Sequence, residues 1–367
     1  MKLSRRNRIA LSFVLIALST GIIIGFIVNS IITHGVIYET QERVKEALNG
    51  AEWLYTARIN EIDRAIYLTS IRYILGGALK KENAFLIKDD MKRLIVDYGL
   101  DFLTLVDKRG VVLFRFHNPG LSGDSLIKDP FIRESLKNKG VSGTQVLPRS
   151  ELLKEGKLLA DRAVFYAIPT PKEKPAQELM ENSGMVLKSA HPVLDEDGKV
   201  LGALMGGILL NRNYEIVDRI KTILFKDAKY KGKEIGTATI FLGDLRISTN
   251  VIDREGHRAT GTRAMKEVEE QVLGKGLPWI HRAFVVDDWY ITAYEPIRDI
   301  QDKIVGMLYV GILENKYVAL KERLVLLFVL GMLIAILVFP ALKFWKKSFW
   351  KRFISARRRL SKRPGCN

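Results

Sequence analysis

Arg115 and His117, in the stretch LFRFHNP at residues 113–119, are the side chains in this sequence best suited to bind a ligand. They lie two residues apart at the end of a strand-like run, a spacing that places both on one face. A guanidinium binds a carboxylate through two parallel hydrogen bonds, and an imidazole adds another donor. The pair predicts a site for a small organic anion. The alternative is a solvent-facing strand end at which Arg115 pairs with a nearby acid.

Two further bases could close this site. Arg162 and Lys188 occur in runs that we interpret as later strands of the same sheet. Each alone is more often a solvated surface base. The predicted ligand-binding set is therefore Arg115, His117, Arg162 and Lys188.

A second group of polar residues surrounds a loop that enters a helix near Thr262. Backbone N–H groups at a helix start attract anions, and Arg263 lies beside them. We favour the simpler interpretation, in which Thr262 caps the helix and Asn250 makes a turn. Two tyrosines that alternate with strand period line either the same cavity or the core. The possible second site comprises Asn250, Arg258, Arg263, Tyr290 and Tyr294.

Catalysis by the chain itself is not indicated. The five histidines are widely scattered, and none has the metal-ligand spacing of HExxH. The only cysteine is Cys366, and the phosphate-binding patterns GxGxxG and GxxxxGK[ST] are absent. We predict no enzymatic activity, no metal site and no cofactor.

The strands and helices that position these residues can be predicted from turn and cap residues in the sequence. Two hairpins are predicted, at 102–117 around Asp107–Gly110 and at 237–249 around Gly243–Asp244. A helix is predicted after each hairpin. The first, at 129–140, has Asp129 as N-cap, Pro130 at its first position and Gly140 as its stop, and the second, at 261–276, is capped by Thr262 and ended by Gly274.

A repeated piece follows each helix. Residues 192–211, PVLDEDGKVLGALMGGILLN, recur at 296–315 as PIRDIQDKIVGMLYVGILEN. They lie in two strand pairs, 187–194 with 199–210 and 289–297 with 303–313. The order strand, strand, helix, strand, strand, strand thus occurs twice. This predicts an α+β fold with tandem antiparallel-sheet domains at 81–224 and 225–322, helices on one face of each sheet, and a surface loop at 170–184.

Four glycines that recur in the repeated piece weaken a strand and require a reason. Gly202, Gly207, Gly306 and Gly311 are attributed to close packing of a helix on the sheet.

A long helix precedes the first domain. Between residues 36 and 79 there is no proline, and apolar residues recur at steps of three and four. Residues 33–80 therefore predict a helix that packs against the domains, against a second copy of the chain, or both. Gly76-Gly77 is expected to loosen its end.

Two uncharged runs, residues 9–32 and 324–342, are long enough to cross a bilayer. Four basic residues within 1–8 precede the first run, and ten within 343–367 follow the second, with no acid in either tail. Positive flanks predict two transmembrane helices, 9–32 and 323–343, with cytoplasmic termini and residues 33–323 outside the plasma membrane. A cleaved signal peptide is the less favoured alternative. Most of the net charge of +17 lies in the tails, so it does not indicate nucleic-acid binding.

Four stretches are characteristic in combination: LVDKRGVVLFRFHNP (105–119), GDSLIKDP (123–130), TIFLGDLRISTNVIDREGHRATGTRA (239–264) and YITAYEPIRD (290–299). Together with the two repeated hairpins, they resemble the tandem Cache sensor region of bacterial and archaeal transmembrane receptors, in the Cache 3/Cache 2 fusion form. The resemblance covers nearly all of residues 33–323 and both apolar runs. It implies a PAS-like sheet of five or six strands in each half, a small-molecule pocket, a homodimer along the long helix and a signal passed through the second span. In related sensors of organic acids, an arginine and a histidine after the same turn bind the ligand.

Family members continue into a histidine kinase, a methyl-accepting chemotaxis region or a cyclase, whereas here only 27 residues follow Pro340. We therefore expect a membrane-anchored sensor of a small organic ligand, a carboxylate by preference, with its output module missing from this chain. The alternative is an anchored binding protein that acts as the partner of a separate kinase or chemotaxis protein.

Overall fold

The computed structural model describes residues 5–80, 88–174, 179–316, 319, 321–331 and 333–334. The chain divides into two units, residues 1–39 with 315–367 and residues 40–314. The predicted basic tail at 344–367 and the end of the second apolar run lie outside the described residues. Within the described residues, no helix is long and apolar enough to cross a membrane.

The long helix is present, and it is longer than predicted. α1 runs from Arg5 to Ser70, and α2 (Tyr73–Lys80) and α3 (Lys88–Tyr98) follow it. Most of the predicted apolar stripe is buried, including Val44, Ala51 and Ile62. α1 ends before Gly76-Gly77, which lies inside α2 instead. At its end the hydroxyls of Thr69 and Ser70 donate to carbonyl oxygens of the preceding turn (2.7 and 2.9 Å), a local competition with the helix ladder.

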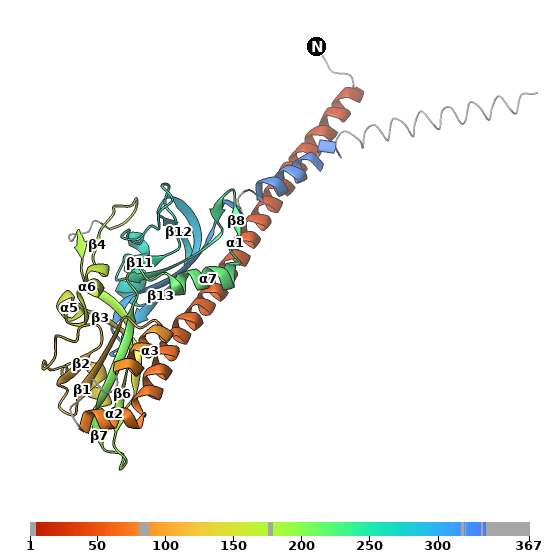
Figure 1. Ribbon diagram of the computed structural model, residues 1–367. Coiled ribbons are helices and arrows are strands. Elements are labelled where there is room, and N and C mark those ends of the chain that lie inside the picture. The colour runs from red at the N-terminus through yellow and green to blue at the C-terminus, as the bar shows by residue number, and fades with distance from the viewer. Residues whose placement is uncertain are drawn as a thin grey trace, which may run out of the picture. The chain divides into compact units, whose positions relative to one another are not determined.

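The first sheet contains the first predicted hairpin and the first copy of the repeat. Its strands are β1 (Phe102–Asp107), β2 (Val112–Arg115), β3 (Val141–Leu147), β6 (Gly184–Leu194) and β7 (Val200–Leu209). They pair antiparallel in the order β2-β1-β7-β6-β3. Three short helices, α4 (Pro130–Ser135), α5 (Arg149–Glu155) and α6 (Lys157–Arg162), belong to this part of the chain. We call this assembly the first domain (Figure 1).

The second sheet has the same topology. β10 (Gly236–Leu242), β11 (Leu245–Thr249), β12 (Trp279–Val285), β13 (Asp288–Arg298) and β14 (Ile304–Leu313) pair in the order β11-β10-β14-β13-β12. α7 (Glu215–Phe225) packs on β10, and α8 (Lys266–Glu269) continues into a π-helix, Glu270–Gly274. We call this assembly the second domain (Figure 1). Both hairpins and the twofold strand order are therefore confirmed.

Two small ribbons complete the secondary structure of the described residues. β4 (Phe165–Tyr166) pairs with β5 (Met180–Glu181), and β8 (Lys229–Tyr230) pairs with β9 (Lys233–Glu234). β5 lies within the stretch 170–184, which was predicted to be a loop.

One of the two predicted helix N-caps is correct, and the other is wrong. Asp129 caps α4, because its side chain accepts from the backbone N–H groups of Phe131 and Ile132. Thr262 does not cap the next helix, because α8 begins only at Lys266 and its N-cap position is Met265. The backbone of Thr262 instead accepts from Arg246 N (2.9 Å), which ties the loop to β11. Gly274 ends the helical segment as predicted.

The recurring glycines have a different cause from the one expected. A Cβ atom added at Gly202 would lie 2.1 Å from the carbonyl oxygen of Val106, and one at Gly306 would lie 2.0 Å from that of Phe241. The close approach is therefore between neighbouring strands of one sheet rather than between sheet and helix.

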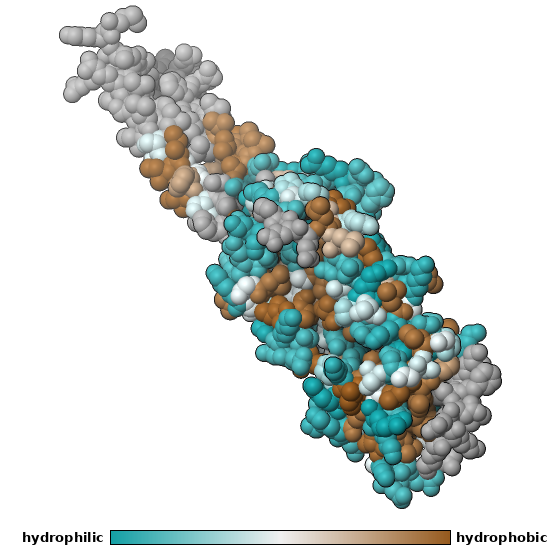
Figure 2. All heavy atoms as spheres, turned by 90° about the vertical axis from the view of Figure 1, so that its left-hand side faces the viewer, coloured by the Kyte–Doolittle hydropathy of each residue, from teal (hydrophilic) through white to brown (hydrophobic). Residues whose placement is uncertain are grey.

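A bridging segment, residues 165–173 of the first domain, bonds to the loop 261–265 of the second. Ile168 N donates to Gly261 O (2.9 Å), and Lys266 N donates to Lys172 O (3.0 Å). Exposed apolar side chains such as Tyr166 and Ile168 occur here. On the face shown in Figure 2, apolar and polar residues are interspersed over the folded domains.

Candidate functional site

The first domain contains a cavity of 410 Å³ between the start of α4, the strands β3 and β6, and α5. Its charged lining consists of three bases, Lys128, Lys154 and Lys188, and three acids, Asp129, Glu151 and Glu155. Phe102, Leu126 and Met205 supply apolar walls. The cavity therefore combines both charges with an apolar floor, a lining suited to a small polar organic molecule.

Lys188 is the predicted site residue that lies in this cavity. It comes from β6, and its side chain is only 1% exposed. Its ammonium donates to Asp129 Oδ2 (2.6 Å) and to Gln145 Oε1 (2.9 Å), and it lies 4.7 Å from the centroid of the Phe131 ring. Burial lowers the pKa of Lys188, and the charge of Asp129 opposes that shift.

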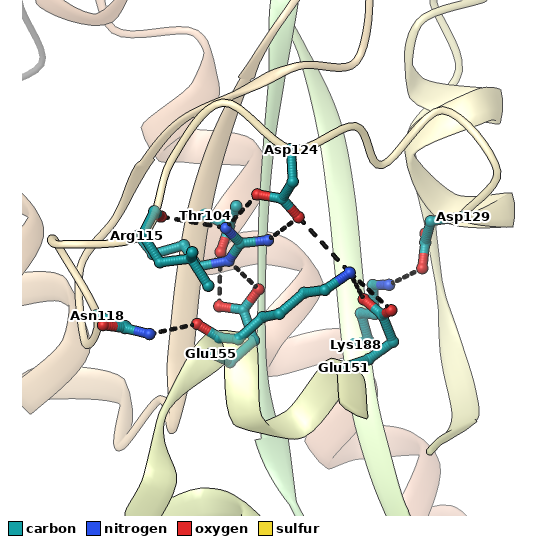
Figure 3. A network of polar contacts seen from close by, with 10 residues as sticks. Thr104, Arg115, Asn118, Asp124, Asp129, Glu151, Glu155 and Lys188 are labelled. Atoms are coloured by element: carbon teal, nitrogen blue, oxygen red, sulfur yellow. Dashed lines mark hydrogen bonds and ion pairs between the residues drawn. The ribbon is translucent and has the colours of Figure 1, made fainter. Parts of the chain in front are cut away.

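Arg115 lies beside the cavity, and its guanidinium donates hydrogen bonds to two carboxylates of this chain (Figure 3). Asp124 accepts from both Nη atoms (2.7 and 2.9 Å), and Glu155 accepts from Nε (3.0 Å). Thr104 donates to the second oxygen of Glu155 (2.7 Å). Burial acts to lower the pKa of Arg115, but Asp124 and Glu155 outweigh it and raise that pKa. Arg115 is fully buried, so the solvent-facing alternative fails although its acid pairing is present.

His117 and Arg162 occupy other positions than the sequence suggested. β2 ends at Arg115, so the alternation of a strand does not extend to His117, which is exposed. Arg162 ends helix α6 and is not on a strand. Its Nη2 donates to Asp101 Oδ2 (2.5 Å) and to Leu209 O (3.2 Å). A ligand role for these two residues stays a prediction.

The polar residues of the possible second site have protein partners. Asn250 accepts from Ala238 N (2.7 Å) and donates to Val217 O (2.8 Å), which joins β10 to α7. Arg258 forms a bidentate ion pair with Asp218 (2.8 Å for both bonds). Arg263 pairs with Asp244, and burial raises the pKa of that carboxyl.

Tyr290 and Tyr294 lie on β13 and belong to the core cluster of the second domain. Tyr290 also lines a cavity of 480 Å³ together with Thr237. A buried arginine that sequence analysis missed, Arg246 on β11, interacts electrostatically with both tyrosines. Asp124 and Glu155 were missed as well. A charge between apolar neighbours in a strand, as in LRI at 245–247, is the signal that could have indicated Arg246.

Two antiparallel five-stranded sheets of one topology and a long preceding helix define an α+β fold. Residues 208–324 match the family described as single cache domain 3. This match agrees with the resemblance to a Cache sensor region that the motifs indicated.

Solved structures of bacterial proteins are similar to the chain at TM-scores below 0.5. The periplasmic domain of LuxQ from Vibrio cholerae is 11% identical with a TM-score of 0.43, covering 73% of this chain and 98% of that chain. The sensor domain of the V. cholerae histidine kinase DctB is 12% identical with a TM-score of 0.39, covering 76% and 98%. The ligand-binding domain of the Campylobacter jejuni chemoreceptor Tlp3, in complex with 4-methylisoleucine, is 9% identical with a TM-score of 0.37, covering 76% and 91%. No curated protein sequence matches the chain.

Proposed function

We propose that the chain is a membrane-anchored, extracytoplasmic sensor that binds a small organic ligand in the first-domain cavity and transmits a signal across the membrane. The observation that carries this proposal is the 410 Å³ cavity around the buried Lys188, in a chain that also contains a Cache domain. A buried ammonium that lines a cavity is a suitable partner for a ligand carboxylate.

The charge balance of the cavity refines the ligand class. Three acids face three bases in its lining, so a polyanion would meet as much repulsion as attraction. A ligand with one carboxylate and one amino group matches both signs. The carboxylate would lie toward Lys188 and Lys154, and the amino group toward Glu151.

Membrane anchoring is supported by the sequence and by exposed side chains. Both apolar runs lack charge and have basic flanks. Large apolar residues are exposed at the described positions of both runs, among them Ile22, Phe26 and Leu327. Such a concentration of exposed apolar side chains favours burial in lipid.

A matched pair of variants tests the ligand site. Glu151 and Glu134 each form an ion pair with a lysine three residues later (2.8 Å in both), but only Glu151 lines the cavity. The purified full-length chain is screened by thermal shift against amino acids, simple carboxylates and phosphates. A ligand at 100 times its Kd stabilises the folded state by about 2.7 kcal/mol. We expect an amino acid to raise the melting temperature, Glu151→Gln to weaken that effect and Glu134→Gln to leave it unchanged.

Two results would contradict the ligand assignment. Equal responses of Glu151→Gln and Glu134→Gln would place the ligand outside this cavity. A panel in which no compound changes the melting temperature would remove the proposed ligand class.

The single cysteine makes the topology testable. In intact cells, a membrane-impermeant maleimide should leave Cys366 unlabelled until the membrane is permeabilised. In a Cys366→Ser background, Glu196→Cys, at an exposed turn between β6 and β7, should react at once. Labelling of Cys366 in intact cells would reject the proposed orientation.

A further inference from the structure

The sequence repeat places a titratable side chain at the same position of each sheet. His191 immediately precedes Pro192 of the first copy, and Glu295 immediately precedes Pro296 of the second. His191 lies on β6 and Glu295 on β13, and these two strands have the same place in the strand order of their sheets. Both side chains face helix α1, which runs past both domains (Figure 1).

Each of the two side chains has an acid of α1 as its neighbour. His191 Nε2 is 2.8 Å from Asp63 Oδ1. Glu295 and Glu52 together line a cavity of 310 Å³ between α1, β3 and β13. Asp63 follows Glu52 by about three helical turns, so the two acids lie on the same face of α1. The two repeats therefore contact one face of one helix, with a histidine against an acid in the first domain and a glutamate against an acid in the second.

The first contact, between His191 and Asp63, is held by several neighbours. The imidazole is 12% exposed, and its centroid lies 5.3 Å from that of the Tyr67 ring. It fills the space beside Gly140, where an added Cβ atom would lie 2.2 Å from the ring. Ser189 donates to the same Asp63 oxygen (2.8 Å). The hydrogen bond from His191 holds the pKa of Asp63 below its usual value, so this carboxylate keeps its charge while the imidazole titrates.

The second contact, between Glu295 and Glu52, is a like-charge pair. Within the described part of the chain, neither carboxylate has a hydrogen bond or an ion pair with a base. Glu295 is half-buried in the cavity wall. Burial raises its pKa, and the negative charge of Glu52 raises it further. The ionised Glu295 consequently repels α1, and a proton on Glu295 removes that repulsion.

The other titratable groups around the two contacts are bonded elsewhere or neutral. Arg298 and Asp299 also line the cavity, but both form their hydrogen bonds within the turn that joins β13 to β14. Tyr55 lines it as well, and burial raises the pKa of its hydroxyl, which is hydrogen-bonded to β3. Beside His191, Tyr67 is the other titratable side chain in ring contact, and β7 places the apolar Leu204 opposite it.

We propose that the chain senses acidification through α1, because protonation of His191 and of Glu295 strengthens the attachment of this helix to both domains. A proton on the imidazole turns its hydrogen bond into an ion pair with Asp63. A proton on Glu295 ends its repulsion with Glu52. The two effects have the same sign, although the residues differ. The proposal concerns the attachment of α1 and requires no ligand in the first-domain cavity.

The direction of each titration sets the pH window. Histidine changes its charge between about pH 5 and 8. The pKa of Glu295 is raised, so its contribution to stability is fully present below the unfolded value of about 4.3 and is lost as pH rises through the folded value. The pKa of Asp63 is lowered, so its contribution is present above about 3.9 and is lost as pH falls through the folded value. Attachment should therefore strengthen from about pH 8 to about pH 5 and weaken again in strong acid.

Hydrogen–deuterium exchange of the purified full-length chain measures this attachment. Protection of residues 52–66 of α1 is determined at about pH 8 and about pH 5. An unfolded peptide measured in parallel corrects for the pH dependence of exchange itself. We expect wild-type protection to rise by about 4–25-fold on acidification, as the product of two partly exposed contacts of about 2–5-fold each.

The two single variants should act at opposite ends of the pH range. His191→Gln keeps a hydrogen-bond donor but has no charge, so it should lower protection by about 2–5-fold near pH 5 and leave it unchanged near pH 8. Glu295→Gln lacks the repelling charge at every pH, so it should raise protection by about 2–5-fold near pH 8 and leave it unchanged near pH 5. The double variant should show no pH response.

A second histidine and glutamate provide matched controls. His257 lies 3.7 Å from Glu255 in one exposed turn of the second domain. His257→Gln and Glu255→Gln should both leave the pH response of α1 at its wild-type size. A control variant that abolishes this response would contradict the assignment to the two α1 contacts.

Two results would overturn the proposal. The first is a wild-type pH response in the double variant. The second is an equal loss of protection at both pH values in His191→Gln, since that is the effect of a structural hydrogen bond alone. If His191→Gln does not fold, Asp63→Asn removes the charge that the imidazolium meets and should reduce the pH response by about 2–5-fold. A full response in Asp63→Asn would then overturn the proposal.

Discussion

The two sheets share one topology, yet they treat a buried arginine in opposite ways. In the first domain Arg115 is enclosed by Asp124 and Glu155, and four of its hydrogen bonds stay within the chain. In the second domain Arg246 is equally buried, but within the described residues it meets hydroxyls and rings rather than carboxylates. The first arginine has its counter-ions within the chain, whereas the second keeps a buried Nε with no hydrogen-bond partner among the described residues.

The difference shows that burial alone does not reveal whether an arginine has a counter-ion within the chain. Desolvation of a charge is expensive, so a folded chain must supply a counter-ion, or a ligand must do so. The partner of the arginine is therefore more informative than its depth.

The largest expected effect is a difference in stability between the variants of the two buried arginines. Arg115→Met leaves Asp124 and Glu155 without their cation, and we expect a loss of about 3–5 kcal/mol in the free energy of unfolding. Arg246→Met removes a charge that lacks a counter-ion, so ligand-free stability should stay the same or increase. Urea denaturation of both variants measures this contrast. Similar losses in the two would contradict it.

Glycine variants should affect the two sheets equally. Gly202→Ala and Gly306→Ala each place a methyl group against the carbonyl oxygen of a neighbouring strand. Backbone cannot move aside as a flexible side chain does, so each variant should lose about 1–3 kcal/mol. Thermal denaturation checks this expectation. A tolerated substitution in one sheet alone would show that the two sheets differ in backbone packing as well.

Smaller effects are expected where α1 contacts each domain. Tyr55 is 2.8 Å from Thr144 of the first domain in a buried hydroxyl pair, and Arg58 forms an ion pair with Glu215 of the second (3.3 Å). Tyr55→Phe should cost about 1 kcal/mol. Glu215→Gln should cost less, about 0–1 kcal/mol, because that carboxylate is partly exposed. Chemical denaturation of the two variants tests the order, and a larger loss in Glu215→Gln would reverse it.

The smallest expected effect is the pH dependence that Asp124 gives to the first domain. The hydrogen bond from Arg115 holds the pKa of Asp124 below its usual value. A depressed carboxyl pKa contributes stability that is present above the unfolded value, about 3.9 for aspartate, and is lost as pH falls through the folded value. Stability measured between pH 5 and pH 2 should therefore fall less steeply in Asp124→Asn than in wild type. The same pH dependence of stability in Asp124→Asn and wild type would show that Asp124 makes no such contribution.

The predictions that held concern local structure. Both hairpins follow from alternating residues around short turns, and Asp129 followed by Pro130 indicates a helix start without further context. The Thr262 cap failed because backbone bonds to β11 and the bridging segment hold residues 261–263 in a loop. The partners of Arg115 could not be predicted, because Asp124 and Glu155 are brought to it by a loop and by α5. Arg246 was overlooked because strand alternation does not show whether a buried charge has a partner.

The bridging segment, residues 165–173, gives the two domains shared hydrogen bonds. It bonds to the loop at 261–265 whose Thr262 contacts Arg246, and it begins three residues after α6 ends in the first domain. A rearrangement of that loop would therefore break hydrogen bonds that the two domains share. Thermodynamic linkage requires that any factor by which occupancy of one domain alters affinity in the other act equally in the reverse direction.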